Sequence, residues 1–352
     1  MSFNAAFLSS LRVAAPGSAI RFIAEPEHLA AVSALVPAAD AVHFTTGSIP
    51  PRHQGGSRRL LKEAWLVARL LEQAELLDAE QVIFTSVTSG VLLAVHAVRP
   101  SFPVLVMHHA ALETIATGVR SFFPMVLRLD LAPTLRHMVL SGSIERELLS
   151  LMPSLSGRTR VIDHPLVPAT LTFTEPATGR LRFGTIGHLD ASKGFGALVG
   201  LARRFPDQDF THVGRCLEPL EHVPSNLHFP GRGELLTAER YAIELAHLDY
   251  ALFVHPSSSY RLSISGAALD AVKYATPILG LRTPGLVHLF EQLGDIGLLA
   301  GSMEELTDCI ARLIEDGRGK HHAAQRARLV AGQQRFSTEA VGLQLRTVLG
   351  GD

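Results

Sequence analysis

Residues 255–277 read HPSSSYRLSISGAALDAVKYATP, and this stretch decides the fold that the sequence predicts. The apolar run DYALFV comes directly before it and is typical of a buried parallel strand, whereas LDAVKY has the spacing of an amphipathic helix. The stretch therefore predicts a strand, a loop and a helix. In a doubly wound sheet, such a loop lies at the carboxyl end of a strand, where ligands bind.

The start of this predicted helix is suited to an anionic ligand. Ser265 and Gly266 stand where the first backbone N–H groups of the helix are free, and such groups bind phosphates. Asp270 follows one turn later, where its carboxylate repels phosphate but accepts hydrogen bonds from a pair of sugar hydroxyls. The pattern predicts a site for a ligand that carries both groups.

Composition sets the size and class of the protein. The chain has 352 residues, 47% hydrophobic and 18% charged, which is enough for two domains that each bury a core. A net charge of -1 argues against a nucleic-acid partner. Cys216 and Cys309 lack metal-ligand spacing and predict free thiols in a reducing cytoplasm. No apolar run approaches the roughly 18 residues of a membrane span.

The order of predicted elements divides the chain into four parts. Strands alternate with helices over residues 1–166, residues 167–180 are a threonine-rich linker, residues 181–334 form a second alternating domain, and residues 335–352 form a last helix. The opening residues FNAAFLSSLRV read as a helix without a strand before it. We therefore expect an uncovered apolar face beside the strand AIRFIA, and a natural reading frame that starts upstream with a strand and a glycine loop.

Two groups of polar residues follow apolar strands of the first domain. Ser86, Thr88 and Ser89 follow the strand VIFTS, where their hydroxyls either touch an acceptor substrate or cap the next helix. His108 follows the strand PVLVM and is either a functional residue or a structural cap. The sequence leaves both alternatives open.

Two apolar segments of the first domain need a partner surface. The helix predicted over residues 57–80 places six residues toward the core, namely Leu60, Leu61, Trp65, Ala68, Leu71 and Leu76. The segment around Phe122, Phe123 and Leu127 is flanked by arginine residues, which suits either a buried helix pair or an interfacial contact with lipid.

Two glycine-containing loops of the second domain follow strands. The loop GHLDASKG holds Gly187, His188 and Lys193, and a lysine–glycine pair after a strand is a good phosphate-binding candidate. The loop around Gly231 follows the strand NLHF.

These motifs resemble the retaining glycosyltransferases with two Rossmann-like domains, known as the GT-B fold, and those of family 4 in particular. The resemblance covers most of the chain and is best from Arg182 to Leu306. Leu262 stands where the family has its first acid, and His188 stands where it has an arginine. The matching positions are Pro256-Ser257, Leu269-Asp270-Ala271, Ala275-Thr276-Pro277, Gly187 and Lys193-Gly194.

The resemblance implies an α/β protein of two Rossmann-like domains, whose parallel sheets face each other across a cleft and whose last helix crosses back to the first domain. It implies transfer of a sugar from a nucleotide diphosphate sugar to a glycan or lipid-linked acceptor in polysaccharide or glycoconjugate biosynthesis, without a metal or another cofactor. The enzyme would be cytoplasmic, with a peripheral contact to the inner face of the membrane as an open alternative. His108 and Lys193 would be catalytic, and the donor would be bound by Gly187, His188, Lys193, Gly231, Ser263, Ser265, Gly266 and Asp270.

Two alternatives remain at this point. A non-catalytic relative would use the same fold to bind a nucleotide sugar, a glycan or a partner enzyme, and Leu262 and His188 favour it. A nucleotide-sugar epimerase of the same build would need several acids and a base in the cleft, and the sequence offers few.

Overall fold

The computed structural model describes residues 2–47, 56–118, 121–129, 131–169, 171, 179–256 and 258–350. The predicted linker therefore lies mostly outside the described residues, as does Ser257. The chain forms two compact units. Unit 1 holds residues 1–167, 261–264 and 335–352, and unit 2 holds residues 168–260 and 265–334.

Unit 1 contains two parallel sheets. β1 (Ile20–Ala24) pairs with β2 (Val42–Thr46), and a second sheet has the order β3 (Val82–Phe84), β4 (Val104–Met107), β5 (Leu135–Val139) and β6 (Thr159–Val161). The helices of the unit are α1 (Ser2–Ala14), α2 (Pro26–Ser33), η1 (Ala38–Asp40), α3 (Gly56–Leu76), α4 (Ser89–Val98), α5 (Glu113–Ala116), α6 (Phe123–Leu127), α7 (Gly142–Leu151), η2 (Pro153–Leu155) and α14 (Thr338–Leu349).

The opening helix α1 packs against both sheets of unit 1. Ala5 and Leu8 are buried against the side chains of β1, including Phe22, while Phe7 joins the core beneath β4 and β5. The last helix α14 lies beside α1 and adds Val341 to that core. The expectation of an uncovered apolar face beside β1 was therefore wrong, because α1 covers it.

The apolar residues of α3 do not all face the core. Val67, Leu71 and Ala74 recur at helical spacing and pack into the core of unit 1. Trp65 is 60% exposed and Leu61 is 62% exposed. These two residues lie on a different side of α3 from the residues that pack into the core. Leu76 is exposed as well, so the predicted inward orientation of these three residues was wrong.

The apolar segment around α6 is mostly buried. Phe123 and Leu127 belong to the core of unit 1, whereas Phe122 is 59% exposed. A lipid contact through Phe123 and Leu127 was therefore a wrong prediction, because those side chains already pack against protein. Within the described residues, no helix has both the length and the apolar character needed to cross a membrane.

Unit 2 is built on one parallel sheet. Its order is β12 (Gly297–Ala300), β11 (Ile278–Leu281), β10 (Tyr250–Phe253), β7 (Arg182–Leu189), β8 (Asp209–Cys216) and β9 (Leu227–His228). The helices are η3 (Ala191–Lys193), α8 (Phe195–Arg204), α9 (Ala238–Ala246), α10 (Gly266–Lys273), α11 (Pro284–Leu293), α12 (Met303–Asp316) and α13 (Lys320–Gly332), with η4 (Gln333–Phe336) before α14.

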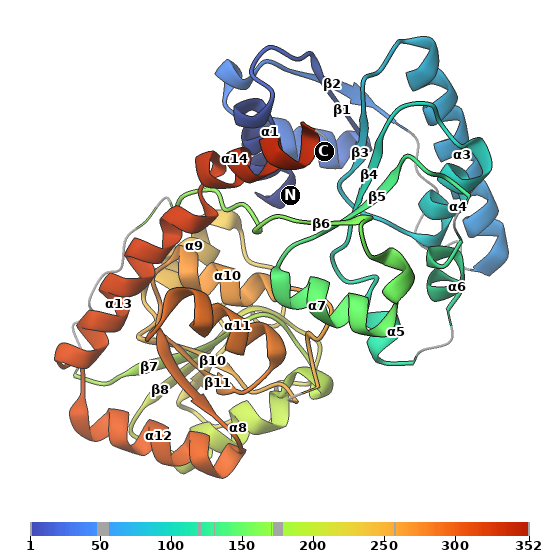
Figure 1. Cartoon of the computed structure of the whole chain (residues 1–352). Coiled ribbons are helices and arrows are strands. Elements are labelled where there is room, and N and C mark those ends of the chain that lie inside the picture. Colours follow the sequence, from blue (N-terminus) through green and yellow to red (C-terminus); the bar gives the residue numbers. More distant parts are fainter. Residues whose placement is uncertain are drawn as a thin grey trace. The chain divides into compact units, whose positions relative to one another are not determined.

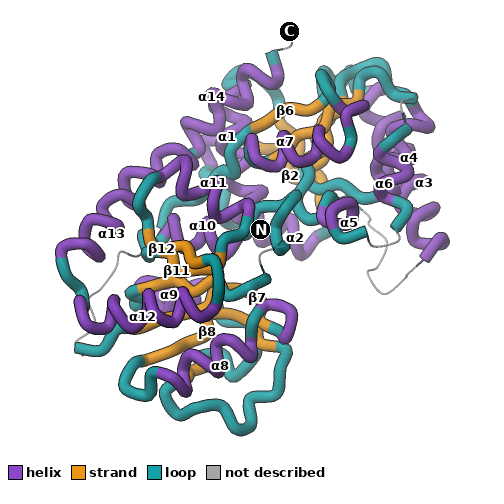
Figure 2. Tube along the Cα trace, turned by 60° about the horizontal axis from the view of Figure 1, so that its bottom comes forward, coloured by secondary structure: helices purple, strands orange, loops and turns teal. Residues whose placement is uncertain are grey.

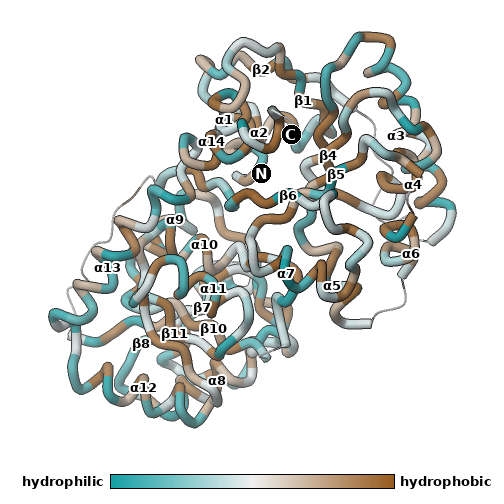
Figure 3. Tube along the Cα trace, in the orientation of Figure 1, coloured by the Kyte–Doolittle hydropathy of each residue, from teal (hydrophilic) through white to brown (hydrophobic). Residues whose placement is uncertain are grey.

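The sheet of unit 2 is the middle of three layers. α8 and α12 cover one face and contribute Leu198 and Ile310 to the core, while α9, α10 and α13 lie on the other face (Figures 1 and 2). β10 and β11 have hydrophobic colours in Figure 3, and the residues of β10 are all buried. This continuous burial is what a parallel sheet covered on both faces requires.

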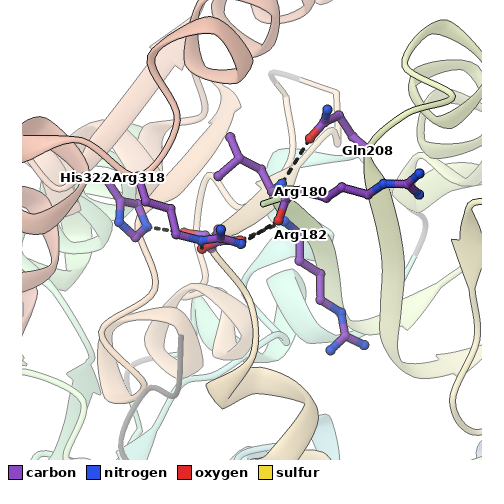
Figure 4. Close-up of polar contacts among 7 residues, drawn as sticks. Arg180, Arg182, Gln208, Arg318 and His322 are labelled. Carbon is purple, nitrogen blue, oxygen red and sulfur yellow. Dashed lines mark hydrogen bonds and ion pairs between the residues drawn. The ribbon is translucent and has the colours of Figure 1, made fainter. Parts of the chain in front are cut away.

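A buried carboxylate ties the start of β7 to the segment before α13. Asp249 accepts hydrogen bonds from the backbone N–H of Arg182 at 2.8 Å and from the Arg318 guanidinium at 2.7 and 2.8 Å. The ring of His322 on α13 donates to the carbonyl oxygen of Asp249 at 3.1 Å. Arg318 also donates to the carbonyl oxygen of Arg180, as Figure 4 shows. The Asp249 side chain is 0% exposed and that of Arg318 is 13% exposed, so this pair is largely desolvated.

Replacing Asp249 with alanine is expected to destabilise unit 2 by about 3–5 kcal/mol, because it leaves the Arg318 charge buried without its partner. Urea unfolding followed by circular dichroism measures this change. Asp209→Ala is a matched control, since its pair with Arg180 is 3.7 Å apart and partly exposed; that change should cost less than about 1 kcal/mol. Equal losses in the two variants would contradict the structural role of Asp249.

Candidate functional site

The carboxyl ends of β7 and β8 approach each other unusually closely. Gly214 has φ +149°, and a Cβ atom there would lie 1.9 Å from the carbonyl oxygen of Gly187. No other residue type fits that position without moving a strand. Gly187 in turn has the first turn of α10 beside it, since an added Cβ would meet Ala267 at 3.8 Å. Two strand ends and the start of a helix thus meet at glycine backbone, of which Gly187 is partly exposed and Gly214 is buried.

The loop after β7 places Lys193 at this same edge of the sheet. The Asp190 side chain accepts a hydrogen bond from the backbone N–H of Lys193 at 2.9 Å and caps η3. Gly194 follows with φ +88°, and a Cβ atom there would lie 2.8 Å from the carbonyl oxygen of Val254. Glycine is therefore required at position 194, where the turn presses the chain against the end of β10.

The ammonium group of Lys193 is held by Tyr260. Lys193 Nζ donates to Tyr260 Oη at 3.0 Å and lies 4.4 Å from the centre of its ring. Tyr260 has φ +58°, an uncommon conformation for a residue other than glycine. His255 Nδ1 lies 3.4 Å from the carbonyl oxygen of Lys193. Burial lowers the pKa of His255 to about 4. The lysine is thus positioned by contacts to its side chain and to its backbone.

The start of α10 supplies donors beside Gly187. Ser265 caps the helix, and its Oγ accepts a hydrogen bond from the backbone N–H of Ala268 at 3.3 Å. The N–H groups of Gly266 and Ala267 have no acceptor within the helix, as is usual in a first turn. These groups and Lys193 form an electropositive edge suited to a phosphate.

Asp270 is already engaged by a tyrosine. Tyr241 Oη donates to Asp270 Oδ2 at 2.7 Å. Burial raises the pKa of Asp270, while the hydrogen bond from Tyr241 and the charge of Lys273 act in the opposite direction. One carboxylate oxygen therefore orients the group, and the other is left to accept from a ligand hydroxyl.

The predicted glycine loop lies next to the end of β8. The backbone N–H of Cys216 donates to the carbonyl oxygen of Gly233 at 3.0 Å. Gly231 is closely packed, because a Cβ atom there would lie 2.5 Å from the carbonyl oxygen of Glu234. Six predicted donor-binding residues lie in unit 2, namely Gly187, His188, Lys193, Ser265, Gly266 and Gly231, with Asp270 one turn further along α10.

The structure adds two tyrosines that sequence reasoning did not assign. Tyr241 and Tyr260 are two of only four tyrosines in the chain, and each contacts a residue that the sequence singled out. Tyr260 lies in the loop after β10, so its position in the sequence could have assigned it to the predicted ligand site. The position of Tyr241 in the sequence gave no such indication, because its contact with Asp270 joins two different helices.

The middle of the loop after β10 belongs to unit 1. Leu262 is fully buried in the core of that unit. Glu113 Oε1 accepts from the backbone N–H of Leu262 and from the hydroxyl of Ser263, both at 2.8 Å. Arg261 forms an ion pair with Glu147. The hydroxyl of Ser263 is therefore used inside unit 1, and Ser263 is not grouped with the predicted donor-binding residues of unit 2.

The remaining predicted residues of unit 1 have structural partners. His108 is 1% exposed, and its Nε2 lies 3.1 Å from Nδ1 of His137. Burial lowers the pKa of His108 to about 3 and holds that of His137 well below its usual value. The Oγ1 of Thr88 accepts from the backbone N–H of Val91 at 3.2 Å and caps α4, with Ser89 as the first residue of that helix. Ser86 is exposed before this cap.

The described part of the chain contains no group of three His, Cys, Asp or Glu residues placed to hold a metal ion. Cys216 and Cys309 are buried free thiols. The charge at the edge of the sheet therefore comes from the side chains and helix start described above.

No family model and no curated protein sequence matches this chain. Solved structures do match it. Anabaena Alr3699/HepE, crystallised with UDP and glucose, superposes with a TM-score of 0.70 at 16% identity, covering 99% of this chain and 96% of that one. A glycosyltransferase from Rickettsia africae reaches 0.65 at 12% identity, with coverage of 99% and 95%. WaaG, a glycosyltransferase involved in lipopolysaccharide biosynthesis, reaches 0.65 at 13% identity, with coverage of 99% and 96%.

These likenesses define the class of fold. The chain has the GT-B fold found in these glycosyltransferases, which confirms the fold class predicted from residues 255–277. At such low identity the likeness establishes the fold alone.

Placing an acid at position 262 is expected to damage the fold. Leu262→Glu places a carboxylate in the core of unit 1 and should destabilise that unit by about 3–5 kcal/mol. Leu262→Met keeps the volume and should cost less than about 1.5 kcal/mol. Urea unfolding followed by the fluorescence of Trp65, which lies in unit 1, measures both. A Leu262→Glu variant as stable as the wild type would show that residue 262 does not anchor the loop.

The buried histidine pair is expected to make unit 1 sensitive to acid. His108 stays neutral in the folded state down to about pH 3 but binds a proton near pH 6.5 when unfolded, so stability is lost as the pH falls below about 6.5. At pH 5 this loss should reach about 2 kcal/mol for His108. His108→Gln should flatten the dependence of unfolding free energy on pH. Identical pH profiles for the wild type and His108→Gln would refute this assignment.

Proposed function

We propose that this protein transfers a sugar from a nucleotide diphosphate sugar to a hydroxyl of a glycan or lipid-linked glycan. One observation carries the proposal. Lys193 lies in the loop after β7, at the same carboxyl end of the parallel sheet where the first turn of α10, with the N–H groups of Gly266 and Ala267, lies beside Gly187. The solved structures of HepE, with the same fold, contain UDP, UDP with glucose, or UDP-glucose.

The chemistry requires stabilisation of the leaving group, because negative charge develops on the diphosphate as the glycosidic bond breaks. Lys193 and the start of α10 supply positive charge and hydrogen-bond donors for that purpose. In our proposal Asp270 accepts hydrogen bonds from the ribose hydroxyls through the oxygen that Tyr241 leaves free. No metal ion is part of the proposed reaction.

We further propose that the configuration at the anomeric carbon is retained. The leaving phosphate then takes the proton of the acceptor hydroxyl on the same face of the sugar, and no dedicated carboxylate base is needed. The roles of Ser86, Thr88 and Ser89 toward an acceptor stay predictions, and Thr88 already caps α4. We place the reaction in the cytoplasm, on the ground that the two cysteines are buried free thiols.

A second candidate is a protein that binds the nucleotide sugar without transferring it. Leu262 lies in a hydrophobic core at the position where the resembling family has an acid, and this observation favours the second candidate. His108 is buried against His137, so its geometry lends no support to the predicted contact with the donor sugar. Both candidates predict donor binding, and only the first predicts turnover.

Lys193→Ala is expected to weaken binding of UDP by about 1.5–3 kcal/mol, the usual contribution of a charge-assisted hydrogen bond. Calorimetric titration with UDP, ADP and GDP measures the affinity of each variant. Lys320→Ala serves as the control, because Lys320 is an exposed lysine at the start of α13 in the same unit. Its affinity should match that of the wild type.

Hydrolysis of UDP-glucose and other nucleotide sugars then separates the two candidates. Slow release of sugar by the wild type, reduced in Lys193→Ala, supports a transferase. Tight binding of donors without release of sugar supports the binding protein. Failure of every nucleoside diphosphate to bind the wild type would refute both.

A further inference from the structure

An arginine at the end of β8 lies directly beside the position where the resembling family has one on β7. Arg215 and His188 are register partners in the parallel pairing of β8 with β7. Partners across a ladder project from the same face of the sheet. Each is the one exposed residue of its strand, with buried residues on the strand around it.

The neighbouring residues fix which face this is. Leu189 and Cys216, the next pair in register, point into the core beneath α8 and α12. Side chains alternate along a strand, so His188 and Arg215 point to the opposite face, which α9 and α10 cover. Arg215 therefore projects on the side of the sheet that carries the free amides of α10.

The guanidinium of Arg215 has no hydrogen-bond or ion-pair partner among the residues that the structure describes. Other arginines of unit 2 are paired, for example Arg182 with Glu244 and Arg318 with Asp249. The carboxylates of the loops that follow β7 and β8 have other partners. Asp190 accepts from Ser192 and from the backbone of Lys193, and Glu218 accepts from the backbone N–H of Ala191 at 2.8 Å.

The backbone at Arg215 is held from both sides. Gly214 before it packs against Gly187, and Cys216 after it donates to the carbonyl oxygen of Gly233. Arg215 is thus a free cation on a fixed backbone. It stands between the glycine loop at Gly231–Gly233 and the strand end that leads to Lys193.

We propose that Arg215 binds the diphosphate of the donor, supplying from β8 the guanidinium that position 188 on β7 lacks. This inference rests on the proposed function. A diphosphate presents several anionic oxygens, and Lys193 offers a single ammonium group to them. A guanidinium keeps its charge and binds two oxygens at once, so it complements the lysine in a way that an imidazole does not. Arg215 and Lys193 flank the end of β7 and hold the diphosphate between them.

Calorimetric titration of the full chain tests this assignment. Arg215→Ala and Arg215→Gln are expected to weaken binding of UDP by about 10- to 100-fold, whereas Arg215→Lys retains part of the affinity. Arg204→Ala is the matched control, because Arg204 is an exposed arginine on α8, on the opposite face of the same sheet. It should change the affinity less than about twofold, the range expected for a distant surface charge.

The probe series identifies the group that Arg215 contacts. The Arg215→Ala variant should lose affinity for UDP and for inorganic diphosphate while its affinity for uridine stays unchanged. Wild-type affinity for UDP in both Arg215→Ala and Arg215→Gln would overturn the inference and leave the proposed function intact. Equal losses for uridine and UDP would also overturn it, because they place the effect on the nucleoside. Absence of UDP binding to the wild type would remove the proposed function together with this inference.

Discussion

The close approach of β7 and β8 at Gly187 and Gly214 is the constraint on which the proposed site depends. A Cβ atom at position 214 would overlap the carbonyl oxygen of Gly187, so only glycine permits the two strands to stay in register to their ends. That register places Arg215 beside His188. It also fixes the point at which the chain turns into η3 and carries Lys193 toward the end of β10. A shift of either strand end would move the cationic side chains and the bare backbone together.

The loop after β10 is divided between the two units. Tyr260 holds Lys193 in unit 2, and the next four residues belong to unit 1, where Glu113 binds the backbone of Leu262 and the hydroxyl of Ser263. This division gives a physical reason for a leucine at position 262. A side chain in a hydrophobic core contributes stability by leaving water, and a carboxylate there would carry a large desolvation cost. Leu262 therefore anchors the loop in a way that a carboxylate could not.

Positioning of Lys193 and Asp270 by tyrosines is the second feature that unit 2 adds. Each tyrosine hydroxyl fixes a charged group in the absence of a ligand, which reduces the entropy lost when the ligand binds. The two contacts differ in direction. Tyr260 accepts from the lysine, whereas Tyr241 donates to the carboxylate and so leaves one of its oxygens free. A phosphate beside the first group and a pair of hydroxyls beside the second match the two halves of a nucleoside diphosphate.

The sequence by itself determined the features that depend on local chemistry. Alternating apolar runs and helix signals predicted the α/β class, and the order strand, loop and helix in residues 255–277 predicted a ligand site at the edge of a parallel sheet. The helix start at Ser265-Gly266, the capping alternative for Thr88 and the loop that ends in Lys193-Gly194 also followed from residues close together in the chain. Such features have few alternatives, because each is set by one or two neighbours.

Only the tertiary structure decided which apolar and polar residues meet across long separations. The apolar character of Trp65 and Leu262 did not reveal that one is exposed and the other lies in a core formed by residues more than a hundred positions away. The sequence left open that His108 contacts a ligand, whereas in the structure its ring lies beside that of His137 on the adjacent strand. The pairing of Arg215 with His188 depends on strand register, which a sequence period of two residues leaves undetermined. Long-range packing selects among partners of similar chemistry, and local patterns carry no information about that choice.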